Sequence, residues 1–472
     1  MLHQCPCLEP DLRLRWEHIE PQGLLYTLER PHQPRTMRLA PVGVLMVMLM
    51  DGRASVQNVD LRAQRLGIEA PAGFLDHLVT QLFQLGFARL RPAHALEHQI
   101  LPGTQHDCEA CGRSCQGQLI GPLATGEAQR IFDLYDTLAQ TRPRLQDQQP
   151  IVTVPDQPGL HLNLCEGRCI FLDHDGLCAI HRTAGMEAKP SICQTFPYVR
   201  VYTEEGLRLG LANHCFRHHR QWQPTYGPPL RATLPESLRS LPTFTVYHAP
   251  FDTLPFQRPD APTRQRRARF LSTEARVLDY LATREASLSG LAALMLGDEP
   301  NATAQPSRFT PQALAHFHTA LQRLAAQDLS PSFLSFILES HGALADTFRK
   351  WHAHFSAYVA KPPTGLIAFD PRSERYVLEL IRRHLWLREA LRFPSPFAAV
   401  AWMIAGALVA QVASNGAADP FDTFGEMLAT WQRFTNEDER FALLFPQPQD
   451  AQRALAAVAR LDPHDTRQRK SP

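Results

Sequence analysis

Eight cysteines in one stretch of this 472-residue chain are the residues most able to do chemistry, because thiols at short spacings can bind a metal together. They are Cys108, Cys111, Cys115, Cys165, Cys169, Cys178, Cys193 and Cys215. Thiolates are soft ligands that suit zinc and iron–sulfur clusters, and steps of two or three intervening residues let two sulfurs from one turn reach the same centre. Four thiolates complete either a zinc site or a cubane cluster. The spacing therefore predicts two four-ligand sites, or one cluster with a smaller second site, and does not by itself separate iron from zinc.

Five histidines lie close to these cysteines in the sequence and are further candidates. They are His174, His181, His214, His218 and His219. A neutral imidazole can replace a thiolate on zinc, or it can hydrogen-bond to a ligand sulfur. We expect these histidines at the surface or beside ligands rather than on the metal. No general base can be identified from the sequence.

The composition is that of a folded, soluble chain. Charged residues make up 20% and hydrophobic residues 44%, and the formal net charge is +1. A charge so near zero gives no general attraction to nucleic acid or to an acidic membrane, so we expect neither as a partner. The apolar stretch 397–413 is slightly short for a membrane span and contains Gln411, which favours a buried core helix.

The first residues predict a cytoplasmic protein, because they lack a basic segment followed by an apolar run. Thiols stay reduced in the cytoplasm, where clustered cysteines more often bind metal than form disulfides. We interpret Cys5 and Cys7 as incidental thiols of an unstructured N-terminus, with a redox or extra ligand pair as the alternative.

Three parts follow from the pattern of apolar and turn-forming residues. Residues 12–98 predict a small α/β module of the winged-helix kind, with a helix starting at Ser55 and short strands on either side of its helices. Residues 99–225 predict a loop-rich domain organised by metal. Residues 230–461 predict an all-α region, because five caps each precede a proline at a first helical position. These pairs are Thr310-Pro311, Ser330-Pro331, Asp370-Pro371, Ser395-Pro396 and Asp419-Pro420. The predicted fold class is multidomain and predominantly α.

The cysteine region resembles the CxxCxxCC family of zinc- or iron-chelating cysteine-cluster proteins. The matching segments are 108–115, with three cysteines, 169–182, with a Cys-x8-Cys step followed by Ile-His-Arg, and 193–198, with Cys-x-x-Phe-Pro. The family ends its first cluster in two adjacent cysteines, whereas Ser114 precedes Cys115 here, and Cys165 is the candidate to compensate. The resemblance implies a metal centre at these cysteines.

Within that family the arrangement is most similar to flagellin lysine N-methylases, which also place a helical region after the cysteines. The similarity implies methylation of protein lysines with S-adenosylmethionine and favours a [4Fe–4S] cluster over Zn²⁺. The residues themselves do not show methyl transfer. There is no glycine-rich turn of the doubly wound nucleotide-binding kind, and the Cys-x3-Cys-x2-Cys order of radical S-adenosylmethionine enzymes is missing.

The N-terminal module resembles the small leader-peptide-binding domain of the pyrroloquinoline-quinone D type. The shared features are the apolar helix, the Asp51-Gly52-Arg53 turn and the closing Leu85-Gly86-Phe87. The resemblance implies that the module holds a protein or peptide substrate, while a structural or DNA-binding type of winged helix remains the alternative. The whole chain is then either a protein-modifying enzyme or a non-catalytic metal-binding or electron-transfer accessory of one.

Overall fold

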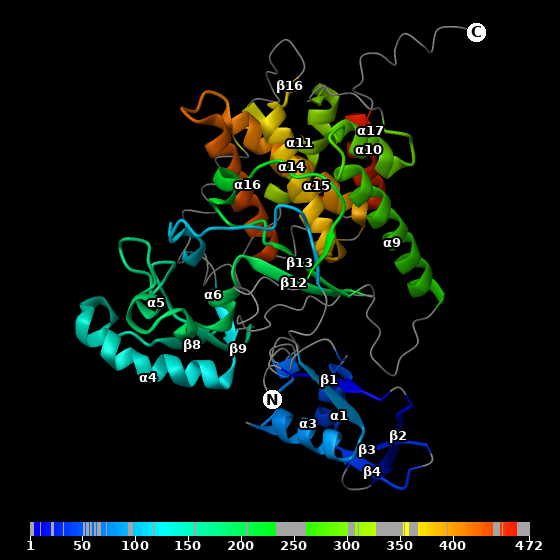
Figure 1. Cartoon of the computed structure of the whole chain (residues 1–472). Helices are drawn as coiled ribbons and strands as arrows, with labels where there is room; N and C mark the ends of the chain where they lie inside the picture. The colour runs from blue at the N-terminus through cyan, green and yellow to red at the C-terminus, as the bar shows by residue number, and fades with distance from the viewer. Residues whose placement is uncertain are drawn as a thin grey trace. The chain divides into compact units, whose positions relative to one another are not determined.

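A computed structural model describes residues 4–232, 261–300, 307–326, 353–357 and 367–459, with short gaps inside these ranges (Figure 1). The chain divides into two compact units. Unit 1 comprises Met1–Gln99, Cys115–Arg208 and Arg231–Arg264, and unit 2 comprises Ile100–Ser114, Leu209–Leu230 and Gln265–Pro472. The stretch predicted as a single cysteine domain therefore supplies residues to both units.

The predicted fold class is only partly correct. The chain is multidomain and rich in helix, but it is mixed α/β, with several small sheets. All of the described strands have between two and seven residues. Such short strands leave little alternation of apolar and polar residues in the sequence. The sequence pattern therefore favoured loops in residues 99–225.

The N-terminal module begins with strands. Its elements are β1 (Gln4–Leu8), β2 (Arg13–Ile19), β3 (Gly23–Glu29), β4 (Thr36–Leu39), α1 (Pro41–Met48), α3 (Phe74–Gln84) and β5 (Ala88–Pro92). Strands β2, β3 and β4 form an antiparallel meander, and β1 pairs with β5. The expectation of an unstructured N-terminus is wrong, because Cys5 and Cys7 both belong to β1 and Cys5 is fully buried.

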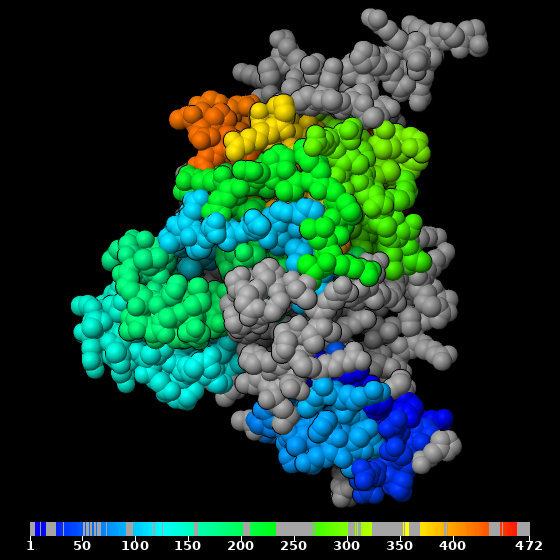
Figure 2. Space-filling model, in the orientation of Figure 1, coloured from blue at the N-terminus to red at the C-terminus, as the bar shows by residue number. Residues whose placement is uncertain are grey.

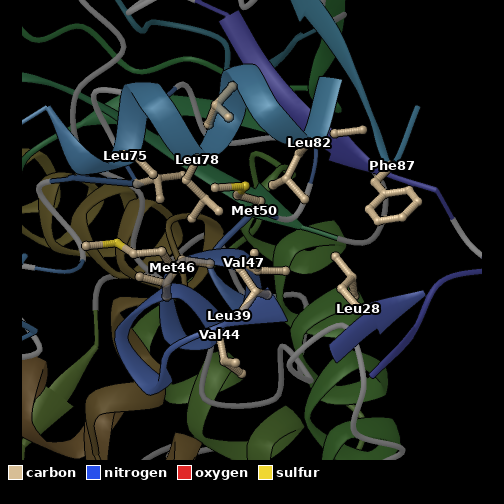
Figure 3. Close-up of a cluster of buried hydrophobic side chains, with 14 of the residues drawn as sticks. Leu28, Leu39, Val44, Met46, Val47, Met50, Leu75, Leu78, Leu82 and Phe87 are labelled. Atoms are coloured by element: carbon tan, nitrogen blue, oxygen red, sulfur yellow. The ribbon is translucent and has the colours of Figure 1, made fainter. Parts of the chain in front are cut away.

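The core of this module lies between α1 and α3 (Figure 3). Leu75, Leu78 and Leu82 repeat every three or four residues, so they share one face of α3, and this face is buried. Met46 and Val47 of α1 belong to the same core. The predicted cap at Ser55 lies outside the described residues.

The rest of unit 1 combines a three-stranded sheet with helices and a hairpin. These elements are β7 (Ile120–Leu123), α4 (Thr125–Thr141), β8 (Ile151–Val154), β9 (Gln157–Leu162), β10 (Leu164–Cys165), β11 (Arg168–Cys169), α5 (Ala179–Ala184) and α6 (Ser191–Thr195). The sheet order is β7-β9-β8. Helix α4 buries Ile131 and Leu138 and leaves Phe132 exposed, and its outer side faces solvent in Figure 2.

A four-stranded sheet has the order β12-β13-β6-β14. Its strands are β6 (His98–Ile100), β12 (Tyr198–Thr203), β13 (Gly206–Leu211) and β14 (Leu230–Ala232).

Unit 2 is mainly helical. Its helices include α7 (His218–Gln221), α10 (Leu288–Leu296), α11 (Pro311–Ala326), α14 (Pro371–Trp386), α15 (Pro396–Ser414), α16 (Pro420–Glu437) and α17 (Pro448–Ala459), while α9 (Ala261–Leu281) begins just before it. Short strands β15 (Arg308–Phe309) and β16 (Ile367–Ala368) pair with each other. Three predicted caps are confirmed, since Asp370, Ser395 and Asp419 accept hydrogen bonds from backbone N–H groups at the starts of α14, α15 and α16. Thr310 and Ser330-Pro331 lie outside the described residues.

Helix α15 is the core helix of unit 2, as predicted. It is the one described helix that is long and apolar enough to cross a membrane, and 89% of its apolar window is buried inside the protein. Its Gly406 lies directly against the indole ring of Trp431 on α16. The two helices approach closely here because the glycine has no side chain.

We predict that Gly406→Ala lowers the free energy of unfolding of unit 2 by about 1–2 kcal/mol. The added methyl group would overlap the Trp431 ring, and overpacking at about 1–3 kcal/mol outweighs the gain of up to about 1 kcal/mol in helix propensity. Urea unfolding followed by tryptophan fluorescence measures the change.

The matched control is Gly126→Ala in α4, where the nearest atom to the new methyl carbon is Arg130 Nη1 at 3.8 Å. This variant should be unchanged or slightly more stable. Equal stability of the two variants would contradict the packing argument.

Candidate metal centre

The structure sorts the cysteines into two groups that do not follow their order along the chain. Cys115, Cys169, Cys178 and Cys193 pack on one hydrophobic core in unit 1 and are called here the four-cysteine group. Cys108, Cys111 and Cys215 lie together in unit 2 and are called the three-cysteine group. Cys115 thus joins cysteines that follow it in the chain rather than its neighbours Cys108 and Cys111. Cys215, the last of the eight, joins those two instead.

Strand pairing brings Cys115 to Cys169. Strands β10 and β11 form a hairpin whose two-residue turn, Glu166 and Gly167, has positive φ at both positions (50° and 72°). This is the turn geometry that fits the twist of a tight hairpin. Gln116 then forms an antiparallel bridge with Arg168. In an antiparallel ladder the neighbours of a bridged pair also face each other, so Cys115 lies opposite Cys169.

The same hairpin separates Cys165 from the four-cysteine group. Cys165 pairs with Arg168, and Cys169 pairs with Leu164. Successive pairs in a hairpin point to opposite faces of the ribbon. Accordingly Cys169 is buried and Cys165 is exposed. Cys165 is the expected replacement for the thiol missing at Ser114. Metal ligation by Cys165 stays a prediction, and its exposed position on the other face of the hairpin does not support it.

Cys178 is placed by the turn that precedes α5. Leu172 and Cys178 form an antiparallel bridge across this turn, and Asp173 N donates to Leu177 O at 2.8 Å. The Asp173 carboxylate accepts from Arg144 Nη2 at 2.7 Å and from Arg142 Nε at 3.3 Å. The acidic turn is thereby fixed to the chain that follows α4.

Cys193 is placed by a buried carboxylate. Glu127, in the first turn of α4, accepts from the backbone N–H of Ala124 at 3.0 Å and from that of Ser191 at 2.7 Å. Ser191 opens α6, the short helix that carries Cys193. One carboxylate therefore satisfies orphan donors at two helix starts and holds them together.

Burial raises the pKa of Cys169 and of Cys193 well above the ordinary thiol value. The neighbouring cysteines add to this shift, while the charge of Lys189 acts in the opposite direction. Both thiols are therefore protonated at neutral pH without a bound cation. Because metals bind thiolates, loading this group with metal must release protons.

The three-cysteine group contains a tight turn and a buried thiol. Ala110 N donates to Cys108 Sγ at 3.4 Å, and Ala110 has a left-handed backbone conformation with φ 48°. Cys215 is buried, and burial, followed by the charges of Cys111 and Cys108, raises its pKa to about 11.

Contacts within unit 2 hold the segment that carries Cys108 and Cys111. Gln221 of α7 accepts from Asp107 N at 3.0 Å and donates to Asp107 O at 2.5 Å. Arg113 forms an ion pair with Glu426 of α16 at 2.5 Å and lies over the Phe216 ring, 4.6 Å from its centroid. The segment is thus fastened on both sides of its cysteines, to elements that follow Cys215 in the chain.

His106 is a candidate that the sequence reasoning missed. Its Nε2 lies 3.8 Å from Cys215 Sγ. Burial lowers the pKa of His106, so its imidazole is neutral, the form that binds metal. Its position in the sequence, two residues before Cys108, could have identified it as a candidate.

The five histidines singled out from the sequence have different surroundings. His174 and His181 are exposed, whereas His218 and His219 are buried. Burial lowers the pKa of His218, and it lowers that of His214 to about 4. His219 Nε2 is engaged with Asp422 Oδ1 at 2.7 Å, so it belongs to the contact between α7 and α16.

Among the described residues, no three His, Cys, Asp or Glu side chains stand in an arrangement that would hold a metal ion. Comparisons with protein-family models, curated proteins and solved structures find no match to this chain. Metal binding and the family resemblances therefore remain predictions from the sequence.

We predict that Glu127→Ala loosens the four-cysteine group. It leaves the N–H groups of Ala124 and Ser191 without their acceptor, at a cost of about 1–3 kcal/mol for each buried donor. Thermal unfolding and chelator competition should show lower stability and lower metal affinity. Glu127→Gln keeps one acceptor oxygen and should lose less. Equal behaviour of both variants and the wild type would contradict this role.

Acid should weaken the contact between α7 and α16. Hydrogen bonds from Arg220 and His219 hold the pKa of Asp422 well below its ordinary value. A lowered carboxyl pKa contributes stability above the unfolded pKa of about 4, and this contribution is lost as the pH falls further. The difference in melting temperature between wild type and Asp422→Asn should therefore be large at neutral pH and shrink below about pH 4.

The control is Asp450→Asn in α17, because Asp450 forms an ion pair with the exposed Arg453, 3.7 Å away. This surface pair should add little at any pH. A pH-independent difference for Asp422→Asn would contradict the ion-pair explanation.

Proposed function

We propose that this chain is a metal protein whose four-cysteine group holds a [4Fe–4S] cluster, with zinc as the alternative occupant. The observation that carries the proposal is the gathering of four thiols on one core from four separate local structures: a short turn, a hairpin strand, a helix cap and a short helix. Four thiolates are the complete ligand set of a cubane cluster or of an all-sulfur zinc site.

The four-cysteine group offers the number and the type of ligands that such a group needs. Cys115, Cys169, Cys178 and Cys193 would hold it, and the apolar core around them would limit access of water. Lys189 adds a positive charge that acts on Cys169 and Cys193 and favours their thiolates. When bound, a cluster supplies one-electron chemistry, which matches either an enzyme or an electron carrier.

Lysine N-methylation of a protein, with S-adenosylmethionine as methyl donor, is the activity that the family resemblance supports. In that case the N-terminal module binds the protein or peptide substrate in the cytoplasm. The second candidate is a non-catalytic metal-binding or electron-transfer accessory to a protein-modifying enzyme. It is favoured by one observation: the sequence contains no glycine-rich turn of the kind that holds a nucleotide-like cofactor in a doubly wound fold.

The metal assignment predicts brown protein after anaerobic purification, with equal amounts of iron and acid-labile sulfide. Cys193→Ser and Cys178→Ser should each lose the colour and most of the iron, because each removes one of four ligands. Cys165→Ser, which changes an exposed thiol outside both groups, should keep both. Colourless protein with one equivalent of zinc at this group would establish the alternative metal, and wild-type metal content in both variants would refute the ligand set.

Calorimetry with S-adenosylmethionine separates the two candidate functions. Binding to the cluster-loaded protein supports the methylase, and its loss in Cys193→Ser would tie the binding to the cluster. No heat of binding with the loaded wild type favours the accessory protein.

A further inference from the structure

Helix α14 buries two positive charges beside one negative charge. Arg382 and Arg383 are 1% and 2% exposed, and both guanidinium groups lie next to the carboxylate of Glu379. Arg383 Nε donates to Glu379 Oε1 at 2.9 Å, and Arg382 Nη1 is 3.8 Å from Glu379 Oε2. Glu374, the other acidic residue of this helix, accepts from two backbone N–H groups instead. Two cations and one carboxylate leave one positive charge unbalanced.

Three donor atoms of this arginine pair have no hydrogen-bond partner within the described part of the chain. They are Nε and Nη1 of Arg382 and Nη1 of Arg383. Arg382 Nη2, in contrast, donates to the Gly227 carbonyl at 2.6 Å. Burial lowers the pKa of Arg382, and the positive charges of Arg375 and Arg383 lower it further, while Glu379 acts in the opposite direction. Buried guanidinium groups require a counter-charge and acceptors, so an anion is the missing component.

A buried imidazole lies beside the same arginine pair. His218 of α7 is 3% exposed, and neither of its ring nitrogens has a hydrogen-bond partner among the described residues. Its ring centroid is 6.5 Å from that of Tyr376, which is about two turns from Arg383 on α14 and therefore shares a face with it. Burial, followed by the charge of Arg383, lowers the pKa of His218. The neutral imidazole offers one N–H donor and adds no charge.

We propose that Arg382, Arg383 and His218 bind a small carboxylate ligand in unit 2. The planar fork of a guanidinium matches the two oxygens of a carboxylate, which favours this class over a spherical halide. The single unbalanced charge matches a monoanion and disfavours a phosphate or sulfate dianion. The site contains no cysteine and goes beyond the proposed metal centre, so either claim can fail alone.

The test follows the melting temperature of the full chain in sodium acetate and in sodium chloride at equal ionic strength and neutral pH. A ligand that binds only the folded chain raises the melting temperature as its concentration increases. We expect a larger rise with acetate than with chloride. Equal rises in the two salts would indicate a general salt effect and would overturn the proposal.

Two charge variants separate binding from that general effect. Arg383→Gln leaves Glu379 balanced by Arg382 alone and should abolish the excess rise with acetate. Glu379→Gln removes the negative charge that repels the ligand, and it should bind acetate about tenfold more tightly or better. Arg453→Gln is the matched control, because this exposed arginine of α17 pairs only at the surface with Asp450, and it should respond like the wild type.

His218→Ala tests the site without changing its charge. Loss of one neutral hydrogen bond should weaken acetate binding by about 3- to 10-fold. Circular dichroism establishes that each variant is folded before the salts are compared. A wild-type acetate response in both Arg383→Gln and His218→Ala, or weaker acetate binding in Glu379→Gln, would show a closed structural ion cluster and overturn the assignment.

Discussion

Burial of thiols in an apolar core is the constraint on which the four-cysteine group depends. Thiolates are unfavourable there, so without metal Cys169 and Cys193 remain neutral and pack as small apolar side chains. A bound cation would convert the same side chains from packing partners into ligands. The surrounding contacts must then hold the backbone in both conditions, and the Glu127 carboxylate and the Asp173 turn do this with hydrogen bonds that involve no sulfur.

Patterns confined to one helix could be predicted from the sequence. Asp370 and Ser395 cap the helices that they were expected to cap, because capping depends on residues within one turn. Helix α15 was predicted correctly as a core helix, since its apolar composition is independent of its partners. The content of strand was underestimated, because short pairings in unit 1 depend on segments that are distant in the sequence.

The grouping of the cysteines could not be predicted from their spacing. Cys115 joins Cys169 through a bridge between Gln116 and Arg168, and such pairing leaves no local periodic signal. The exposure of Cys165 is easier to predict from the sequence. A Glu-Gly pair between two short strands predicts a two-residue turn, and alternation along the strands then places Cys165 and Cys169 on opposite faces.

The interleaving of the two units also imposes an order on biosynthesis. The last member of the four-cysteine group, Cys193, leaves the ribosome while Glu426, which fastens the segment of Cys108 and Cys111, has yet to be made. At about 5–20 residues per second, the interval is on the order of tens of seconds. During that time the nascent chain carries one complete set of thiols and one unanchored set. The four-cysteine group is therefore complete before the segment of Cys108 and Cys111 can be fastened.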